Sequence, residues 1–299
     1  MKWFCVFEDG VLVRAHRGAT LVPWWSFTKT ILAAAALRLV ELGQLSLEEP
    51  LHGQSCCLRQ LLQHRAGLPD YGELAAYQQA VERGDEPWPV ETLLDRVDSQ
   101  RQRYEPDKGW AYSNVGYWMV RRLIERCCDE PLGSALNRLV CQPLDVANVR
   151  LAEIPSDLYG VEMGEAGPYH PGWVYHGLLV GPLASTALLL QRLMLGQLLS
   201  APTLEMMARG FPLPTYAEPP WPAPAYGLGL MVSATTSGTR VHGHSGAGPG
   251  SQIAVYGRMV GNLHRAVAVW MPTSTIPSGV HRAADQSAVE FLNLTRTAL

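Results

Sequence analysis

The sequence predicts an α/β (α+β) protein in which one antiparallel sheet is flanked by helices and an all-helical domain is inserted. Two observations support this fold class. Residues near both ends of the 299-residue chain form β-prone runs, whereas residues 55–204 show the three-to-four-residue apolar spacing of helices. We therefore expect a discontinuous α/β domain of residues 1–54 and 205–299, a helical domain of residues 55–204, and the active site in the cleft between them.

The N-terminal part predicts a hairpin followed by a buried helix. Two short β-prone runs flank Asp9-Gly10, a dipeptide typical of a type I′ turn. Residues 26–45 then have a helical pattern whose first turns are almost wholly apolar, which favours a place in the core. Gly43 is the expected end of this helix.

After residue 210 the pattern changes from helical to strand-like. Residues 211–227 are dense in proline, so their interior cannot form regular structure and we expect a linker or a stiff loop. Four strand-like runs follow, separated by Ser-Gly, Gly-Pro-Gly and Gly-Asn turn signals, and a last helix covers residues 281–297. These strands would share a sheet with the N-terminal hairpin.

The composition is that of a globular protein, with 47% apolar and 17% charged residues. A net charge of −3 gives no electrostatic reason to expect nucleic acid or an anionic membrane as a partner. No apolar run of membrane-spanning length and no signal peptide is visible. We therefore expect a soluble, cytoplasmic protein whose partners are small molecules.

The cysteine pattern indicates neither a disulfide framework nor a metal site. No CxxC occurs, and two of the pairs are vicinal, which is poor geometry for both. We interpret the cysteines as small buried hydrophobes, with a redox role as the alternative. The six residues are Cys5, Cys56, Cys57, Cys127, Cys128 and Cys141.

Ser26 and Lys29 open the buried helix and form the first candidate for chemistry. Their i, i+3 spacing places hydroxyl and amine on one helical face, near the positive end of the helix dipole. To act as a base near neutral pH, a lysine there needs its pKa lowered by about three units through burial or a nearby positive charge. Such a pair can activate the serine as a nucleophile. The ordinary alternative is an N-cap serine beside a lysine that reaches out to solvent.

Tyr112-Ser113-Asn114 precedes another helical pattern and is the second candidate. A tyrosine hydroxyl can relay a proton, and an asparagine amide can donate to a substrate carbonyl. The structural alternative is an aromatic core contact with Asn114 as the N-cap of the helix.

The third candidate is the run His244-Ser245-Gly246-Ala247 in a predicted strand. A glycine inside a strand indicates close approach of another backbone or of a ligand. The N–H groups of Ala247 and Ser26 could then form an oxyanion hole.

Two other interpretations of this region are weaker. His242 and His244 could face one side and bind a metal, but no HExxH-like partner accompanies them, so we expect no metal and no cofactor. The run also resembles a nucleophile elbow, which requires a following helix; here another strand follows.

Taken together, SFTK, YSN and HSG resemble the SxxK, YxN and K/H-x-G signatures of the serine β-lactamase and penicillin-binding-protein superfamily. The similarity is to the branch with class C β-lactamases, DD-peptidases, D-aminopeptidases and carboxylesterases. LLQHRAGLPDY, YSNVGYWMVRRLIE, YGLGLMV and GHSGAGPG resemble its other blocks, so the resemblance spans nearly the whole chain. It implies a β-lactamase/transpeptidase-like fold.

The resemblance also implies a role for each motif residue. Ser26 would be the acylated nucleophile and Lys29 its base partner. Tyr112 would shuttle protons, Asn114 would position the substrate carbonyl, and the Ala247 N–H would complete the oxyanion hole.

The sequence departs from most β-lactamases at His244, where they have a lysine that helps to bind a substrate carboxylate. A largely neutral histidine attracts carboxylates less, so with Ser245 and Gly246 we expect it to line a site for small carboxylic esters. The alternatives are a D-amino-acid peptidase or amidase, a weak β-lactamase, and a catalytically silent binding protein. Trp25 and Trp110 lie near the motifs as core or cleft wall; lining the acyl pocket, they would favour hydrophobic acyl groups.

Overall fold

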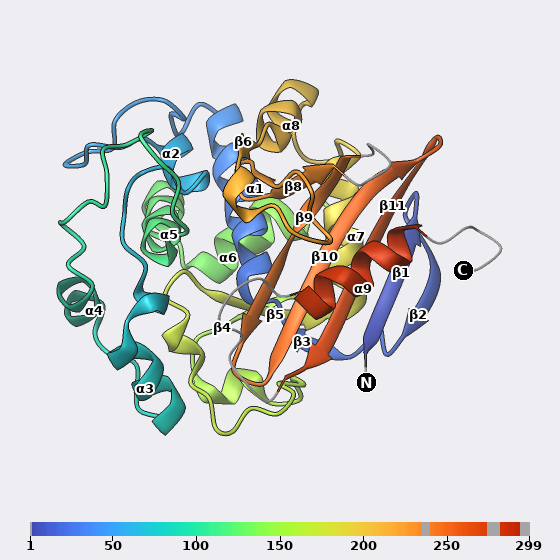
Figure 1. Cartoon of the computed structure of the whole chain (residues 1–299), viewed down its shortest axis with the longest axis horizontal. Helices are drawn as coiled ribbons and strands as arrows, with labels where there is room; N and C mark the ends of the chain where they lie inside the picture. Colours follow the sequence, from blue (N-terminus) through green and yellow to red (C-terminus); the bar gives the residue numbers. More distant parts are fainter. Residues whose placement is uncertain (1, 235–239, 274–281, 294–299) are drawn as a thin grey trace.

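The two ends of the chain meet in one sheet, as the sequence predicts (Figure 1). The computed structural model describes residues 2–234, 240–273 and 282–293. Its main sheet has eight strands in the order β2-β1-β11-β10-β9-β8-β7-β6, and every neighbouring pair is antiparallel. The strands are β1 (Trp3–Glu8), β2 (Val11–His16), β6 (Phe211–Pro212), β7 (Ala225–Tyr226), β8 (Met231–Ala234), β9 (Arg240–Gly248), β10 (Ser251–Val260) and β11 (Leu263–Pro272).

The N-terminal hairpin turns at the predicted dipeptide. Asp9 and Gly10 both have positive φ, at 43° and 84°, as a type I′ turn requires. Strand β1 then pairs with β11 along its whole length, from Trp3 opposite Trp270 to Glu8 opposite Arg265.

Helices cover both faces of this sheet because successive strand residues point to opposite sides. Helices α1 (Thr28–Glu41) and α7 (Leu183–Met194) pack with Val255 and Ala266 on one face. Helix α9 (Arg282–Asn293) packs on the other face, over Tyr256 and Val267 (Figure 1). The two apolar layers enclose the sheet.

The predicted buried helix is divided at its start. Residues Trp25–Phe27 form a 3₁₀ turn, and the α-helix begins at Thr28. Most of α1 is buried, including the run Ala33, Ala34, Ala35 and Ala36. Gly43 follows the helix with φ of 70°, consistent with its expected role as the stop.

The middle of the chain is mostly helical but contains strands, so it differs from the all-helical domain expected for residues 55–204. A three-stranded sheet of order β3-β5-β4 joins this part to the N-terminal part, because β3 precedes Ser26. Helix α7 also packs on the main sheet. The remaining elements are β3 (Leu21–Pro23), α2 (Leu58–Leu62), α3 (Ala75–Arg83), α4 (Val90–Arg96), α5 (Asn114–Cys128), α6 (Leu132–Leu136), β4 (Arg150–Ala152), β5 (Leu178–Pro182) and α8 (Ala201–Ala208).

The proline-dense stretch and the last helix follow the sequence pattern at their described positions. The ends of residues 211–227 pair as β6 and β7, and the interior holds turns, a short 3₁₀ segment, Pro214–Tyr216, and an isolated bridge between Glu218 and Trp221. The predicted Ser-Gly turn at 237–238, His281 and residues 294–297 of the predicted helix lie outside the described residues.

All six thiols are free, and four of them are buried. Burial raises the pKa of Cys5 to about 12 and those of Cys56 and Cys141 to about 11, so these thiols stay protonated at neutral pH. Cys57 is also buried, so four of the six cysteines match the interpretation as small buried hydrophobes, whereas Cys127 and Cys128 are only half-buried. Within the described ranges, none of the helices combines the length and apolar character needed to cross a bilayer.

A buried ion pair ties β1, β11 and α9 together. Arg265 Nη2 donates to Glu8 Oε1 at 2.6 Å, and Arg265 Nε donates to the same oxygen at 3.1 Å. Arg265 Nη1 donates to the carbonyl of Leu292 near the end of α9 at 3.1 Å. Both charged side chains are buried.

Glu8→Gln should lower the free energy of unfolding by about 3 kcal/mol, because it removes the negative charge beside a buried guanidinium. Urea unfolding followed by circular dichroism measures the loss. Glu205→Gln is the matched control, since its partner Arg209 is exposed and the pair should contribute about 0.5 kcal/mol or less. Equal losses in both variants would contradict a structural role for the buried pair.

Candidate active site

Ser26 lies in the short 3₁₀ turn that leads into α1, and it is partly exposed. The preceding residue, Trp25, has φ of 42°, which is rare for a bulky side chain. Its ring covers Gly248, where a Cβ would lie 2.3 Å from a ring carbon, and its Nε1 donates to Ser251 Oγ at 3.1 Å. Strands β9 and β10 therefore hold the serine turn in place.

Lys29 lies one helical turn beyond Ser26, and its side chain has no exposed surface. Its Nζ is 3.2 Å from Ser26 Oγ. Burial lowers the pKa of Lys29 to about 7, and the nearby Asp70 carboxyl opposes that effect. The amine is therefore neutral in a large share of molecules at physiological pH.

Tyr112 approaches the serine from the loop before α5. Its hydroxyl donates to Ser26 Oγ at 2.9 Å, and its ring centroid is 5.0 Å from Lys29 Nζ. Burial raises the pKa of Tyr112 above its usual range, so the phenol keeps its proton at neutral pH. Two groups with different protonation therefore converge on Ser26 Oγ.

Asn114 is the first residue of α5, and it is turned toward Asp70. Its backbone N–H donates to Asp70 Oδ1 at 2.9 Å, and its side chain bonds to the same carboxyl. The N-cap of α5 is Ser113, whose Oγ accepts from the Gly116 N–H at 3.0 Å. Asn114 is therefore not the N-cap of α5, and its hydrogen bonds go to Asp70 rather than to Ser26 or Lys29.

Strand β9 brings Gly246 against the nucleophile turn. A Cβ at Gly246 would lie 2.5 Å from the Ser26 backbone nitrogen, so only glycine permits this approach. The next residue, Ala247, is partly exposed. Ser245 points to the opposite face, where its hydroxyl donates to Met231 Sδ at 3.6 Å. The Ser245 side chain therefore does not face Ser26, contrary to the substrate-binding role expected from the sequence.

His244 lies on the Gly246 side of β9, but its ring is buried and bonded within the protein. Its Nε2 is 2.8 Å from the Tyr226 hydroxyl, and its Nδ1 contacts the Ser245 carbonyl. Both ring nitrogens have protein partners, which weakens the case for contact with a substrate carboxylate.

His242 is paired with His264 rather than with His244. The two Nε2 atoms lie 3.1 Å apart, and burial together with His264 lowers the pKa of His242 to about 3. In the part of the chain that the structure describes, no group of three or more His, Cys, Asp or Glu side chains is placed to hold a metal ion.

Three buried residues near Ser26, Lys29 and Tyr112 were not predicted as site residues: Asp70, His64 and His176. Asp70 and His64 occur in LLQHRAGLPDY, which sequence analysis used only for resemblance. His64 Nδ1 accepts from the Ser113 N–H at 3.0 Å, and its ring lies 4.3 Å from that of Tyr112. His176 Nε2 lies 3.1 Å from Lys29 Nζ, and nothing in the run VYHGLLV signals this contact.

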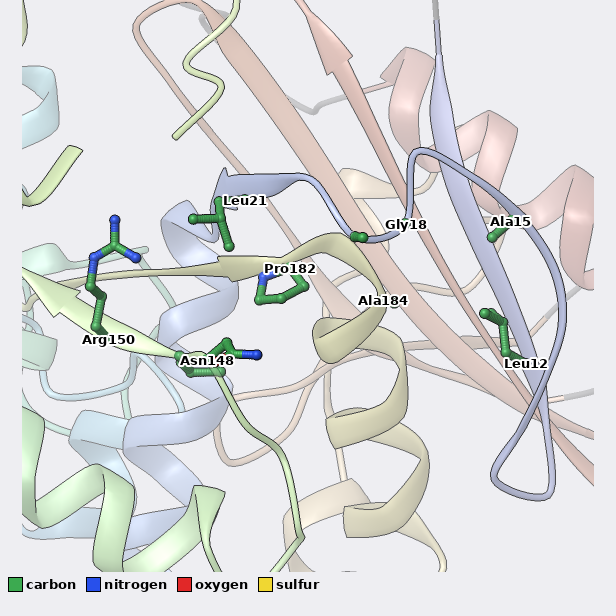
Figure 2. Close-up of a pocket in the computed structure, with 10 residues that line it drawn as sticks. Leu12, Ala15, Gly18, Leu21, Asn148, Arg150, Pro182 and Ala184 are labelled. Carbon is green, nitrogen blue, oxygen red and sulfur yellow. The ribbon is translucent and has the colours of Figure 1, made fainter. Parts of the chain in front are cut away.

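A separate open groove of about 750 Å³ lies where β2 approaches the small sheet. Figure 2 shows Leu12 and Ala15 on β2 facing Leu21 of β3, with Pro182 and Ala184 beside them. Its lining residues do not include Ser26, Lys29 or Tyr112, so this groove is distinct from the candidate active site.

With this geometry in place, the comparisons assign the family. The beta-lactamase family matches residues 3–290, so the chain belongs to the beta-lactamase family. Esterase EstB from Burkholderia gladioli is 28% identical over 181 residues, a match that covers 53% of this chain and 44% of the esterase. The match thus spans less than half the length of that relative.

Solved structures show the same fold at low sequence identity. A D-amino acid amidase from Ochrobactrum anthropi SV3 has a TM-score of 0.77 and 20% identity, covering 97% of this chain and 92% of its own. A D-stereospecific amidohydrolase from Streptomyces sp. has a TM-score of 0.72 and 22% identity, covering 89% and 88%. These likenesses confirm the predicted fold class.

Gly246→Ala should destabilise the protein by roughly 1–3 kcal/mol, because the added Cβ forces β9 away from the Ser26 turn. Urea unfolding measures the loss. Gly167→Ala is the control, since nothing lies within 4 Å of a Cβ at that position. If Gly246→Ala is as stable as this control, the close approach of the two backbones is wrong.

Proposed function

We propose that the chain is a serine hydrolase that forms a covalent acyl-enzyme on Ser26 and acts on small carboxylic esters. The observation that carries this proposal is the convergence of two groups on Ser26 Oγ: an amine with a pKa of about 7 and a protonated phenol. A base and an acid on one hydroxyl are the parts that acyl transfer requires.

In acylation, Ser26 Oγ attacks the ester carbonyl carbon while the Ser26 proton moves to Lys29 Nζ. The N–H groups of Ser26 and Ala247 then stabilise the negative oxygen of the tetrahedral intermediate. When the C–O bond of the ester breaks, Tyr112 protonates the departing alkoxide and regains a proton from Lys29. Water then attacks the acyl carbon, the bond between Ser26 Oγ and that carbon breaks, and one proton of the water passes to Ser26 Oγ, which releases the carboxylic acid.

The surroundings of the serine support neutral substrates with apolar acyl groups. His244 has both ring nitrogens engaged within the protein and thus offers a carboxylate little. Aromatic pairs stand near the serine turn and the Tyr112 loop: Trp25 with Tyr169 at 5.6 Å, and Trp110 with Tyr216 at 5.2 Å. The relative named as an esterase supports the same substrate class.

We place the active site between the two parts of the chain. Gly246 belongs to the main sheet, whereas Tyr112 leads into α5 of the largely helical middle. A substrate that reaches Ser26 would touch both parts. D-amino-acid amides and β-lactams remain alternative substrates, and a catalytically silent binding protein remains the alternative to any hydrolase; a substrate panel separates them.

Ser26→Ala should abolish hydrolysis of a short-chain p-nitrophenyl ester, by about 10⁴-fold or more, because no acyl-enzyme can form. Lys29→Ala should slow it by about 10²–10⁴-fold through loss of the base. Release of p-nitrophenol measures both, with D-phenylalanine amide and a chromogenic cephalosporin tested in parallel.

Ser134→Ala, which removes an exposed hydroxyl on α6, should keep wild-type activity. Unchanged turnover in Ser26→Ala would refute the proposed nucleophile, and turnover of the amide or cephalosporin but not of the ester would refute the ester assignment.

The rate of acylation should depend on pH through Lys29. Because burial lowers its pKa to about 7, the amine is protonated below that pH and cannot accept the Ser26 proton. We expect kcat/KM for the ester to fall about tenfold per pH unit below pH 7 and to level off above it. Initial rates corrected for spontaneous hydrolysis test this; a flat profile from pH 5 to 8 is incompatible with Lys29 as the base.

A further inference from the structure

His176 stands directly behind the proposed base. Its Nε2 lies 3.1 Å from Lys29 Nζ, which is itself 3.2 Å from Ser26 Oγ. Its Nδ1 lies 3.4 Å from the Tyr71 hydroxyl. Ser26, Lys29, His176 and Tyr71 therefore form a continuous line of polar contacts, and the last three side chains are buried.

The chain holds His176 in a tight turn just before β5. The next residue, Gly177, has φ of 103°, and its N–H donates to the Val174 carbonyl at 2.7 Å. The φ of Gly177 disfavours other residues, and a Cβ there would also crowd Leu151 at 3.0 Å and Leu132 at 3.1 Å. The turn thus defines the backbone path directly after His176.

His176 is neutral near physiological pH. Burial, the Lys29 charge and the Arg121 charge lower its pKa well below the usual range. Several other titratable groups face Lys29 or His176 from the packed elements: Asp70, Tyr71, Tyr112, Tyr117, His64 and His244. Asp70 is the carboxyl among them and favours the charged amine, whereas burial lowers the pKa of His64 well below its usual range.

We propose that His176 is a positioning residue that accepts a hydrogen bond from Lys29 and thereby turns the amine lone pair toward Ser26. This inference rests on the proposed roles of Ser26 and Lys29. The ammonium formed in acylation offers only N–H donors, so in this proposal Nε2 is the acceptor in both protonation states of Lys29 and Nδ1 carries the ring proton. That proton is donated to the Tyr71 hydroxyl oxygen, which fixes the tautomer.

The proton balance leaves His176 unchanged. In acylation the Ser26 O–H bond breaks and a Lys29 N–H bond forms. The new ammonium keeps its contact with Nε2, and the ring proton stays on Nδ1 throughout. Ser26 is thus the nucleophile, Lys29 the base, and His176 the group that orients the base.

Removing the acceptor should change Lys29 in two ways. A hydrogen bond to the charged form stabilises the ammonium, so its loss should lower the Lys29 pKa by about one to two units. The amine also loses its fixed orientation, which should lower the plateau of kcat/KM by about tenfold to a hundredfold, as for other residues that orient a catalytic group.

The first experiment measures the pH profile of kcat/KM for the p-nitrophenyl ester in His176→Leu, His176→Gln and Tyr71→Phe. In His176→Leu we expect the lower plateau and an acid limb moved to lower pH. In His176→Gln the side-chain oxygen can accept from Lys29 and should restore both. Tyr71→Phe, which removes one buried hydroxyl and keeps the ring, should shift both in the same direction as His176→Leu but by less.

The second experiment needs no turnover. The chain has three lysines, Lys2, Lys29 and Lys108, and the other two are exposed, so selective lysine labelling gives a simple NMR titration. The Lys29 signal, assigned by its absence in Lys29→Ala, should titrate at lower pH in His176→Leu. The buried-histidine control His242→Leu should leave it in place, since His242 contacts His264 instead.

An unmoved Lys29 titration and acid limb in His176→Leu would overturn the proposal and leave His176 a structural residue. If His176→Leu does not fold, the other two variants test the proposal. A wild-type pH profile in Tyr71→Phe, together with a His176→Gln profile that lacks the wild-type plateau and acid limb, would overturn it equally. Failure of the proposed function looks different: Ser26→Ala would keep its ester activity, while the lysine titration would still report the contact with His176.

Discussion

The structure is organised around an amine that has no exposed surface. The drop in the Lys29 pKa from 10.5 to about 7 corresponds to roughly 5 kcal/mol. Between those pH values the unfolded chain binds a proton that the folded chain lacks, so this residue makes folding less favourable as pH falls from 10.5 toward 7. Burial of the apolar side chains of α1 against the main sheet offsets that cost. Most residues of α1 are buried and contribute to this free energy.

Close contacts of two glycines with the serine turn set the distance between nucleophile and sheet. The absent Cβ of Gly246 allows β9 to touch the Ser26 turn, and the Trp25 ring covers Gly248 two residues later. Trp25 tolerates a positive φ because both ends of its side chain are fixed, by packing on β9 and by the bond to Ser251. Gly246, Gly248 and Trp25 therefore fix the position of the Ser26 turn relative to β9.

How much could be predicted from the sequence depends on how local each feature is. The i, i+3 spacing of Ser26 and Lys29 and the Asp9-Gly10 turn are short-range, and the structure has both as predicted. Strand alternation already implied that Ser245 and Gly246 face opposite sides, and applying it would have removed Ser245 from the site. The contact of His176 with Lys29 joins residues 147 positions apart inside an apolar run, so no periodicity or motif could indicate it.

The order of strands in the main sheet has a consequence for synthesis of the chain. Residues Trp3–Glu8 are synthesised long before their partner strand, Leu263–Pro272. Until then one edge of β1 has no neighbour, and the apolar faces of α1 and α7 lack most of the strands they cover. Until Leu263–Pro272 is synthesised, the nascent chain can form local helices and the N-terminal hairpin but not the complete sheet, and chaperones would protect the exposed edge of β1 during that interval.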